Sequence, residues 1–294
     1  MHVYRYARAS RAMLAVLVCA AAAPPCWGSF VEHRHTSAAG VAVDVISVNL
    51  GSGSVRLGVQ LAYGFPGAAE GLGAMLRRSS PVAAVNGTHF RRMTLKPVGD
   101  IVIAGQPRNF GGMGTAMTVT AGNRVAFRRV EWGKQQDWSE FETVLAAGPT
   151  LLTEGKADVQ SDAEGFTDPY VTGRVSRSAV GRTRGNRLVL ACVGEAVSLN
   201  KLAEVMRDLA CSEAMALGGD ASTAMFYRGR VIHEPGHGLT NVLLIYENPR
   251  RDQLAYLSPP GQRPSVVGES AWEHYQQGRR EMDAGSTGAA RASP

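Results

Sequence analysis

The signatures of several common protein classes are absent from this sequence. Lysine and arginine form no run interleaved with aromatic residues, which argues against nucleic-acid binding. No Walker loop, dinucleotide-binding fingerprint or G-x-S-x-G elbow occurs in the strand and helix context that these motifs need. There is also no repeat of solenoid length and no heptad pattern. The sequence is therefore that of a globular protein, and its functional site has to be identified without these motifs.

Apolar runs long enough to span a bilayer with ease are also missing. The run Ala12–Ala23 follows three arginines and precedes Pro24, which is the pattern of a secretory signal peptide. We therefore predict a signal peptide over residues 1–28, export to the periplasm or the extracellular space, and no membrane span in the mature chain. Because this segment holds three arginines and no acidic residue, the formal net charge falls from +6 to +3 when it is removed.

Cysteine is scarce, with four residues in the chain. Cys19 and Cys26 lie in the predicted signal peptide, which leaves Cys192 and Cys211 in an oxidising compartment. These two could form one disulfide or remain as small buried thiols. The sequence does not fix their separation in space, so both alternatives stay open.

Clusters of metal ligands with a recognised spacing are absent as well, so no structural metal and no cofactor are predicted. The segment HEPGH, His233–His237, is not a zinc-protease motif. Pro235 and Gly236 cannot lie within the continuous helix that such a motif requires. His33 and His35 lie near the predicted mature terminus without a set of acidic or thiol partners at a metal-ligand spacing, and are predicted to lie on the surface.

Short apolar segments with strand-like alternation recur between Gly, Asn and Ser turns through most of the chain. Residues 41–50 and 55–62 are two such segments around a Gly/Ser turn, and a hairpin is the simplest account of them. Helices are predicted within residues 66–79 and after Ser198, which can cap the second helix. In that helix, the residues that should face inward are Leu202, Val205, Met206 and Leu209.

The expected fold is therefore α+β, a single domain over residues 29–248 with mixed or largely antiparallel β-sheets flanked by a few helices. Residues 249–294 are rich in Pro, Gly, Ser, Gln and charge, and are predicted to form a mostly disordered C-terminal tail.

The segment LGGDASTAM places two glycines before a carboxylate, Asp220, between two apolar strands. Glycines leave backbone N–H groups unshielded, and the hydroxyls that follow add donors, so the turn suits a phosphate. A carboxyl group beside a bound anion has a raised pKa, as a general acid requires; Asp220 could also act as a base or hold a sugar hydroxyl. The alternative is an ordinary tight turn, for which Gly-Gly-Asp is common.

Six motifs occur in a compatible order: AVNGTHF, AAGPTLL, RSAVGRT, the helix after Ser198, LGGDAST and TNVLLIYE. Together, from about Val41 to Glu247, they resemble the phosphodiester glycosidase family. The resemblance implies hydrolysis of the glycosyl–phosphate bond of a sugar-1-phosphodiester, and the expected partner is such a compound or a phosphorylated polysaccharide on an exported or envelope glycan. The family's elements correspond to Asn86, Gly87 and Phe90; to Gly148, Pro149 and Leu151; to Arg177, Ala179 and Gly181; and to Asn241.

Two positions depart from the family's pattern. The family's Leu-Asp-Gly-Gly-Gly-Ser loop maps onto Leu217–Ser222, where Gly218 replaces the usual Asp and the carboxylate follows as Asp220. His89 stands where the family often has an aromatic residue. These differences affect where the acidic side chain would lie relative to a substrate and which sugar the site would accept.

The resemblance implies catalytic roles for Asp220, Arg177 and Asn86. Arg174 and Arg182 are expected to be solvated charges at strand ends, although either could replace Arg177 as the phosphate clamp. The substrate-binding residues it implies are Gly218, Gly219, Ser222, Thr223, His89 and Asn241. Many glycosidases use a pair of carboxylates, and candidates for the second are Asp44, Glu142, Glu154, Asp158, Asp162, Asp168 and Glu195. The alternatives are a non-catalytic envelope protein that binds carbohydrate or phosphate on the same fold, and an assembly factor in which the turn is only a turn.

Overall fold

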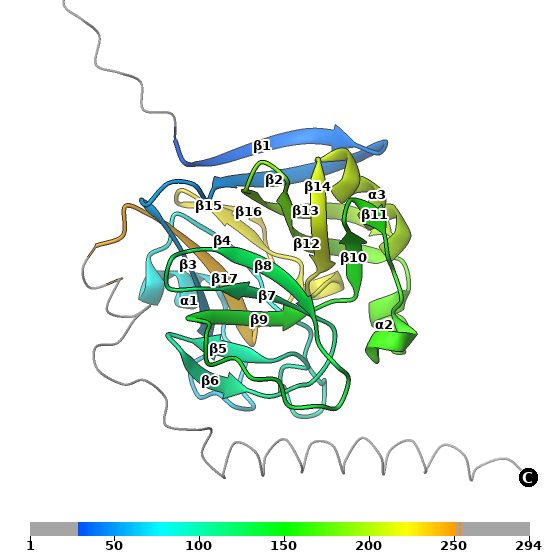
Figure 1. The fold of residues 1–294 in the computed structure, drawn as a ribbon, viewed down its shortest axis with the longest axis horizontal. Coiled ribbons are helices and arrows are strands. Elements are labelled where there is room, and N and C mark those ends of the chain that lie inside the picture. Colours follow the sequence, from blue (N-terminus) through cyan, green and yellow to red (C-terminus); the bar gives the residue numbers. More distant parts are fainter. Residues whose placement is uncertain (1–28, 251–252, 254–294) are drawn as a thin grey trace, which may run out of the picture.

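The computed structural model describes residues 29–250 and residue 253. The predicted signal peptide lies outside these residues, as does most of the predicted C-terminal tail. Strands account for 45% of the structure and helices for 13%, so the fold is β-rich, within the broader α+β expectation. Every strand pair in the described residues is antiparallel, which confirms largely antiparallel sheets (Figure 1).

A seven-stranded sheet forms one side of the domain, with the order β1-β2-β13-β12-β14-β10-β11. Helix α3 (Leu199–Asp208) covers its outer face, and the Ser198 hydroxyl caps the helix by accepting from the amide of Lys201. The predicted inward stripe of this helix is buried, which confirms the expected face. The strands of this sheet are β1 (Val31–Ala38), β2 (Val41–Asn49), β10 (Thr150–Thr153), β11 (Lys156–Ala157), β12 (Val175–Thr183), β13 (Arg187–Val197) and β14 (Cys211–Ala216).

Two five-stranded sheets complete the domain, with the orders β16-β15-β4-β17-β3 and β6-β5-β9-β7-β8. Their inner faces and that of the seven-stranded sheet share the largest apolar core. Helix α1 (Leu72–Ser79) packs on the other face of the first of them. The strands are β3 (Val55–Leu61), β4 (Ala83–Asn86), β15 (Met225–Tyr227), β16 (Arg230–His233) and β17 (Asn241–Glu247), then β5 (Ile101–Ile103), β6 (Gln106–Asn109), β7 (Thr115–Val119), β8 (Val125–Arg129) and β9 (Thr143–Ala147).

The predicted hairpin near the mature N-terminus is wrong in its pairing. Both segments are strands, β2 and β3, but β2 pairs with β1 and β13 whereas β3 pairs with β17. The Gly/Ser turn therefore carries the chain from one sheet to another. Alternation along a strand reflects the burial of its two faces and says nothing of which strand lies beside it.

The histidines predicted to lie on the surface are part of a cluster around Asp44. His33 Nε2 and His233 Nε2 lie 2.9 Å and 3.0 Å from the Asp44 carboxylate, and His35 Nδ1 lies 3.2 Å from it. His35 remains largely exposed, whereas His33 is half-buried. Burial acts to raise the pKa of Asp44, but the hydrogen bonds from the three imidazoles outweigh it and lower that pKa.

The two cysteines of the described chain are free thiols. Cys192 faces the core between the sheets, while Cys211 belongs to the apolar cluster beneath α3. Because they lie in clusters on opposite faces of one sheet, the disulfide alternative does not hold. Burial raises the pKa of each thiol to about 12.

No helix among the described residues is both long enough and apolar enough to cross a membrane.

Candidate active site

The buried side chain of Asn86, at the end of β4, joins three segments of the chain. Its Nδ2 donates to the carbonyl of Gly218 at 2.7 Å, and its Oδ1 accepts from the amide of Ala224 at 3.0 Å. The hydroxyl of Ser178 on β12 donates to the same Oδ1 at 2.6 Å. Gly218 and Ala224 flank the loop that carries Asp220, so one side-chain amide holds both ends of that loop.

Gly87 and Asn241 form a second junction beside the first. Asn241 Oδ1 accepts from the amide of Thr88 at 3.0 Å, and its Nδ2 donates to the hydroxyl of Thr240 at 2.9 Å. A Cβ at position 87 would lie 1.7 Å from Asn241 Oδ1, so only glycine allows this contact. The Asn-Gly motif and the distant Asn241 are therefore parts of one packing arrangement.

The loop between β14 and β15 makes a short turn, Asp220–Ser222, that presents the carboxylate outward. Asp220 is exposed and has a φ of 55°, in the left-handed region that Asp adopts more readily than most residues. A Cβ at Gly219 would lie 2.9 Å from the carbonyl of Ser176, so the loop lies against β12 at this point. Within the described chain, the amides of residues 219–221 have no acceptor, whereas the Gly218 amide donates to Gly87.

Asp220 faces a groove of about 570 Å³. Three further segments line the groove: residues 89–94 after β4, residues 165–171, and His237 from the loop before β17. His237 Nε2 lies 3.4 Å from the Ser222 hydroxyl, and its ring meets Phe90 edge-on at 5.6 Å. The HEPGH segment thus supplies one wall residue, His237, while His233 points to Asp44 instead.

A cation and an aromatic ring stand together at this groove. The guanidinium of Arg92 lies 3.4 Å from the ring centroid of Tyr170, and both side chains are exposed. Tyr170 belongs to the four-residue helix α2 (Pro169–Thr172). Neither residue was predicted, because nothing in the sequence around them departs from an ordinary loop.

A second carboxylate, Asp168, lines the same groove. It caps α2, since its Oδ1 accepts from the amide of Tyr170 at 2.9 Å. Of the seven candidates for a second carboxylate, all within the described residues, Asp168 is the one that lines the groove. Asp44 is held by its histidines, and Asp158 pairs with Arg129.

His89 lies at the back of the groove and is neutral at ordinary pH. Burial lowers its pKa to about 4, and the positive charge of Arg177 acts in the same direction, against a hydrogen bond to the Gly148 carbonyl. The ring lies 5.9 Å from that of Phe166. Its Nε2 is buried and has no hydrogen-bond partner among the residues that the structure describes.

Arg177 is fully buried and does not line the groove. Its Nε donates to the carbonyl of Val197 at 3.2 Å, its Nη1 to that of Val171 at 2.8 Å, and its Nη2 to that of Gly173. Burial lowers the pKa of the guanidinium to about 10, which leaves it charged at neutral pH. The structure thus gives Arg177 a place beneath α2, where it anchors the segment that bears Asp168 and Tyr170.

The nine residues predicted for the site divide into two groups. His89, Gly219, Asp220 and Ser222 line the groove. The others are buried behind it: Asn86, Arg177, Gly218, Thr223 and Asn241. The polar atoms of Asn86 and Arg177 bond to other groups of the protein, so both residues help to hold the segments that line the groove.

Within the described residues, no group of three or more His, Cys, Asp or Glu side chains is arranged to hold a metal ion. The groove instead combines carboxylates, a cation and an aromatic ring, a set suited to a charged sugar derivative.

The sequence model of the phosphodiester glycosidase family matches residues 79–246, more than half of the chain. The chain belongs to this family, and its family and fold indicate a glycosidase-type hydrolase. No curated protein matched the chain in a sequence comparison.

Solved structures share the fold at low sequence identity. The catalytic domain of zebrafish N-acetylglucosamine-1-phosphodiester alpha-N-acetylglucosaminidase, auto-inhibited by its pro-peptide, is 19% identical with a TM-score of 0.60 over 74% of this chain and 82% of that chain. A hypothetical protein from Synechocystis is 16% identical with a TM-score of 0.63, and the match covers 74% of this chain and 62% of that one. A candidate exported protein from Burkholderia pseudomallei is 14% identical with a TM-score of 0.55, over 70% and 74% of the two chains.

Proposed function

We propose that the protein hydrolyses the glycosyl–phosphate bond of a sugar-1-phosphodiester on an exported or envelope glycan. The observation that carries the proposal is the exposure of Asp220 and Asp168 on one groove, beside the guanidinium of Arg92. Family membership supports the type of bond that is broken.

In this reaction, water attacks the anomeric carbon, and the bond between that carbon and the phosphate oxygen breaks. The electron pair goes to the leaving phosphomonoester, and Asp220 takes the proton from the water. Asp168 stabilises the positive charge that develops on the sugar ring. A phosphate leaving group needs less protonation than an alcohol, so stabilisation of its charge supplies much of the rate.

Arg92 and the amides of residues 219–221 are donors that the groove offers to the phosphate in this proposal. Arg177, predicted as the phosphate clamp, acts in this proposal as a positioning residue for α2. Asn86, Thr223 and Asn241 likewise position the loop instead of contacting the sugar. Tyr170 provides an apolar face on which a sugar ring can pack.

His89 adds an acceptor at the back of the groove. One ring nitrogen of His89 bonds to the Gly148 carbonyl, and Nε2 has no partner among the described residues. The Nε2 of the neutral imidazole can therefore accept a hydrogen bond from a substrate hydroxyl that reaches it. Its low pKa prevents a positive charge that would compete for the phosphate.

The glycine at position 218 supports a second candidate function, that of a non-catalytic protein that binds carbohydrate or phosphate. The family's usual Asp is missing at this position, and a Cβ there would lie 3.0 Å from Asn86 Nδ2. The carboxylate two residues later is what distinguishes a hydrolase from a binder in this chain.

The test uses the chain that starts at Ser29 and both anomers of a synthetic N-acetylglucosamine-1-phosphodiester. Release of reducing sugar together with an equal amount of phosphomonoester supports the proposal. Saturable binding without release supports the non-catalytic candidate. Release of an alcohol with retention of the sugar phosphate would contradict both, since a different bond would then be broken.

A further inference from the structure

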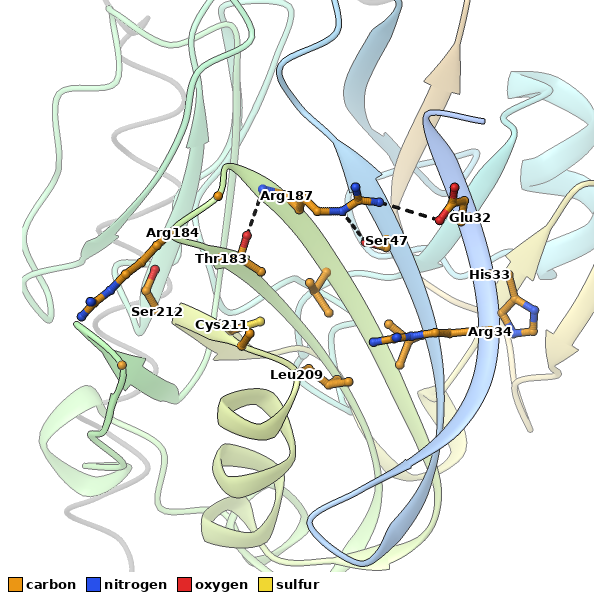
Figure 2. Close-up of a pocket in the computed structure, with 15 residues that line it drawn as sticks. Glu32, His33, Arg34, Ser47, Thr183, Arg184, Arg187, Leu209, Cys211 and Ser212 are labelled. Atoms are coloured by element: carbon orange, nitrogen blue, oxygen red, sulfur yellow. Dashed lines mark hydrogen bonds and ion pairs between the residues drawn. The ribbon is translucent and has the colours of Figure 1, made fainter. Parts of the chain in front are cut away.

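A second and larger cavity, of about 840 Å³, lies on the outer face of the seven-stranded sheet beyond the end of α3 (Figure 2). Its floor comes from the apolar cluster that α3 shares with the sheet, including Val45, Val189 and Leu209. None of the residues assigned to the groove lines it. Neither the proposed function nor the family resemblance gives this cavity a role.

The described residues that line the cavity include three arginines, Arg34, Arg184 and Arg187, but only one carboxylate, that of Glu32. Figure 2 shows Arg34 reaching across from β1 and Arg184 on the opposite side, in the turn between β12 and β13. Both side chains are exposed, and neither has an ion pair or hydrogen bond with the described part of the chain. Arg187 bonds to the Ser47 hydroxyl at 3.0 Å and lies 3.8 Å from the Glu32 carboxylate.

An exposed ion pair at that distance neutralises little of the charge of Arg187. The cavity is therefore positive, with cations on two opposite sides instead of one. Such an arrangement suits a ligand whose negative charges are spaced along a chain, more than a single small anion.

The neutral groups of the lining indicate a sugar polymer and not a nucleic acid. No Trp, Tyr or Phe of the described residues lines the cavity, whereas sites for single-stranded nucleic acid stack bases on aromatic rings. The hydroxyls of Ser47, Thr183 and Ser212 line it. Those of Ser47 and Thr183 accept from Arg187 and can still donate, whereas that of Ser212 donates to the Arg182 carbonyl and can still accept. Hydroxyl groups of this kind match the hydroxyls of sugar rings.

The cavity and the groove lie near opposite ends of the same strand, β12. Ser176, at one end of β12, touches the loop of Asp220, and Thr183, at the other end, lines the cavity. Seven residue steps of a strand span about 23 Å, which exceeds the length of one sugar phosphate unit. A ligand that reaches both sites has to be a polymer.

We propose that this cavity is an accessory binding site for a phosphodiester-linked polysaccharide, with Arg34 and Arg184 as its principal contacts. This site binds the polysaccharide at one point of its chain, while another part of the same polysaccharide lies in the groove, where one of its glycosyl–phosphate bonds is hydrolysed. That last point rests on the proposed function, whereas the binding itself does not.

The experiment measures affinity for a fluorescent hexamer of hexose units joined by phosphodiesters. The mature chain carries Asp220→Asn in every sample so that the probe stays intact. Arg34→Ala with Arg184→Ala is expected to weaken binding about tenfold, since two exposed charge contacts are lost, and to reduce its salt dependence. The matched control, Arg124→Ala with Arg230→Ala, removes two exposed arginines elsewhere in the described structure and should leave the affinity unchanged.

Wild-type affinity in the Arg34 and Arg184 variant, or an equal loss in the control, would overturn the proposal. Equal affinity for an uncharged hexose hexamer, or for a DNA oligonucleotide of the same charge, would overturn it too. Turnover of a single sugar-1-phosphodiester by the two variants on the unmodified Asp220 background is expected to match the wild type. A chain without turnover that still binds the hexamer through these arginines would refute the proposed hydrolysis and retain the accessory site.

Discussion

Asn86 donates from its side chain to the carbonyl of Gly218, on a loop more than a hundred residues further along the chain, at 2.7 Å. The same amide accepts from the far end of that loop, at Ala224. The loop between these two points carries Asp220, the carboxylate that faces the groove. The side chain of Asn86 therefore holds both ends of the loop that carries Asp220.

Asn86→Ala removes this clamp, so the Gly218 carbonyl, the Ala224 amide and the Ser178 hydroxyl each lose the hydrogen bond to Asn86. We expect it to lower the free energy of unfolding by about 3 kcal/mol, because each orphaned group loses its hydrogen bond without gaining water. Urea denaturation of the two proteins measures the difference. Asn200→Ala, at an exposed position of α3, is the control and should change stability by less than about 0.5 kcal/mol. Equal effects of the two substitutions would contradict the clamp.

Gly87→Ala tests the junction with Asn241. The added Cβ would lie 1.7 Å from Asn241 Oδ1, a buried atom fixed by its own hydrogen bond. We expect a loss of about 3 kcal/mol or more in the free energy of unfolding. At Gly53 a Cβ meets nothing within 4 Å, so Gly53→Ala should be tolerated. Thermal melts of the two variants, made in parallel, separate a steric effect from a general intolerance of glycine replacement.

The buried, neutral His89 should make the free energy of unfolding depend on pH in the acid range. The folded protein binds a proton at this imidazole with a pKa of about 4, against an ordinary value of 6.5. Between these values the unfolded chain binds more protons than the folded one, so stability falls as the pH drops from 6.5 to 4 and levels off below. The loss amounts to about 2 to 3 kcal/mol.

His89→Phe, which restores an aromatic side chain, should remove this part of the pH dependence. The measurement is urea denaturation of wild type and variant at pH 7 and pH 4.5. His237→Phe changes an exposed histidine of the same groove and should keep the wild-type pH dependence. If His89→Phe and the wild type lose the same stability on acidification, the imidazole is not held neutral by its surroundings.

Cys192 and Cys211 should react as free, protected thiols. Burial and a pKa raised to about 12 suppress the thiolate, the form that attacks a maleimide. We expect no labelling of the native mature chain, two labels per chain after unfolding in urea, and no change of melting temperature with a reducing agent. Mass spectrometry counts the labels; a single linked pair in the non-reduced unfolded chain would refute the free thiols.

Much of the fold follows from local patterns in the sequence. The capped helix after Ser198 and the short strands around Asp220 agree with the alternation and turn residues that predict them. The pairing of β2 with β13 instead of β3 does not follow, because partner choice depends on contacts between distant segments. The three histidines around Asp44 depend on the same long-range pairing.

The candidate site shows the same division. Asp220 and Ser222 could be found because a charged turn between apolar strands is locally unusual. Arg92, Tyr170 and the role of Asp168 as a groove residue could not, since loops of ordinary composition bring them together. Asn86 and Arg177 were identified by their motifs, but only the structure shows that Asn86 bonds to two backbone groups and to Ser178, and Arg177 to three carbonyls.

Asp220 is the residue on which the proposed hydrolysis depends most directly. The decisive measurement is the kcat/KM of Asp220→Asn on a synthetic sugar-1-phosphodiester, beside Asp162→Asn as an exposed carboxylate outside the groove. We predict a loss of about 100-fold or more for Asp220→Asn, the range expected when a general base is removed, and wild-type activity for Asp162→Asn. Full activity in Asp220→Asn, with the fold intact, would contradict the account.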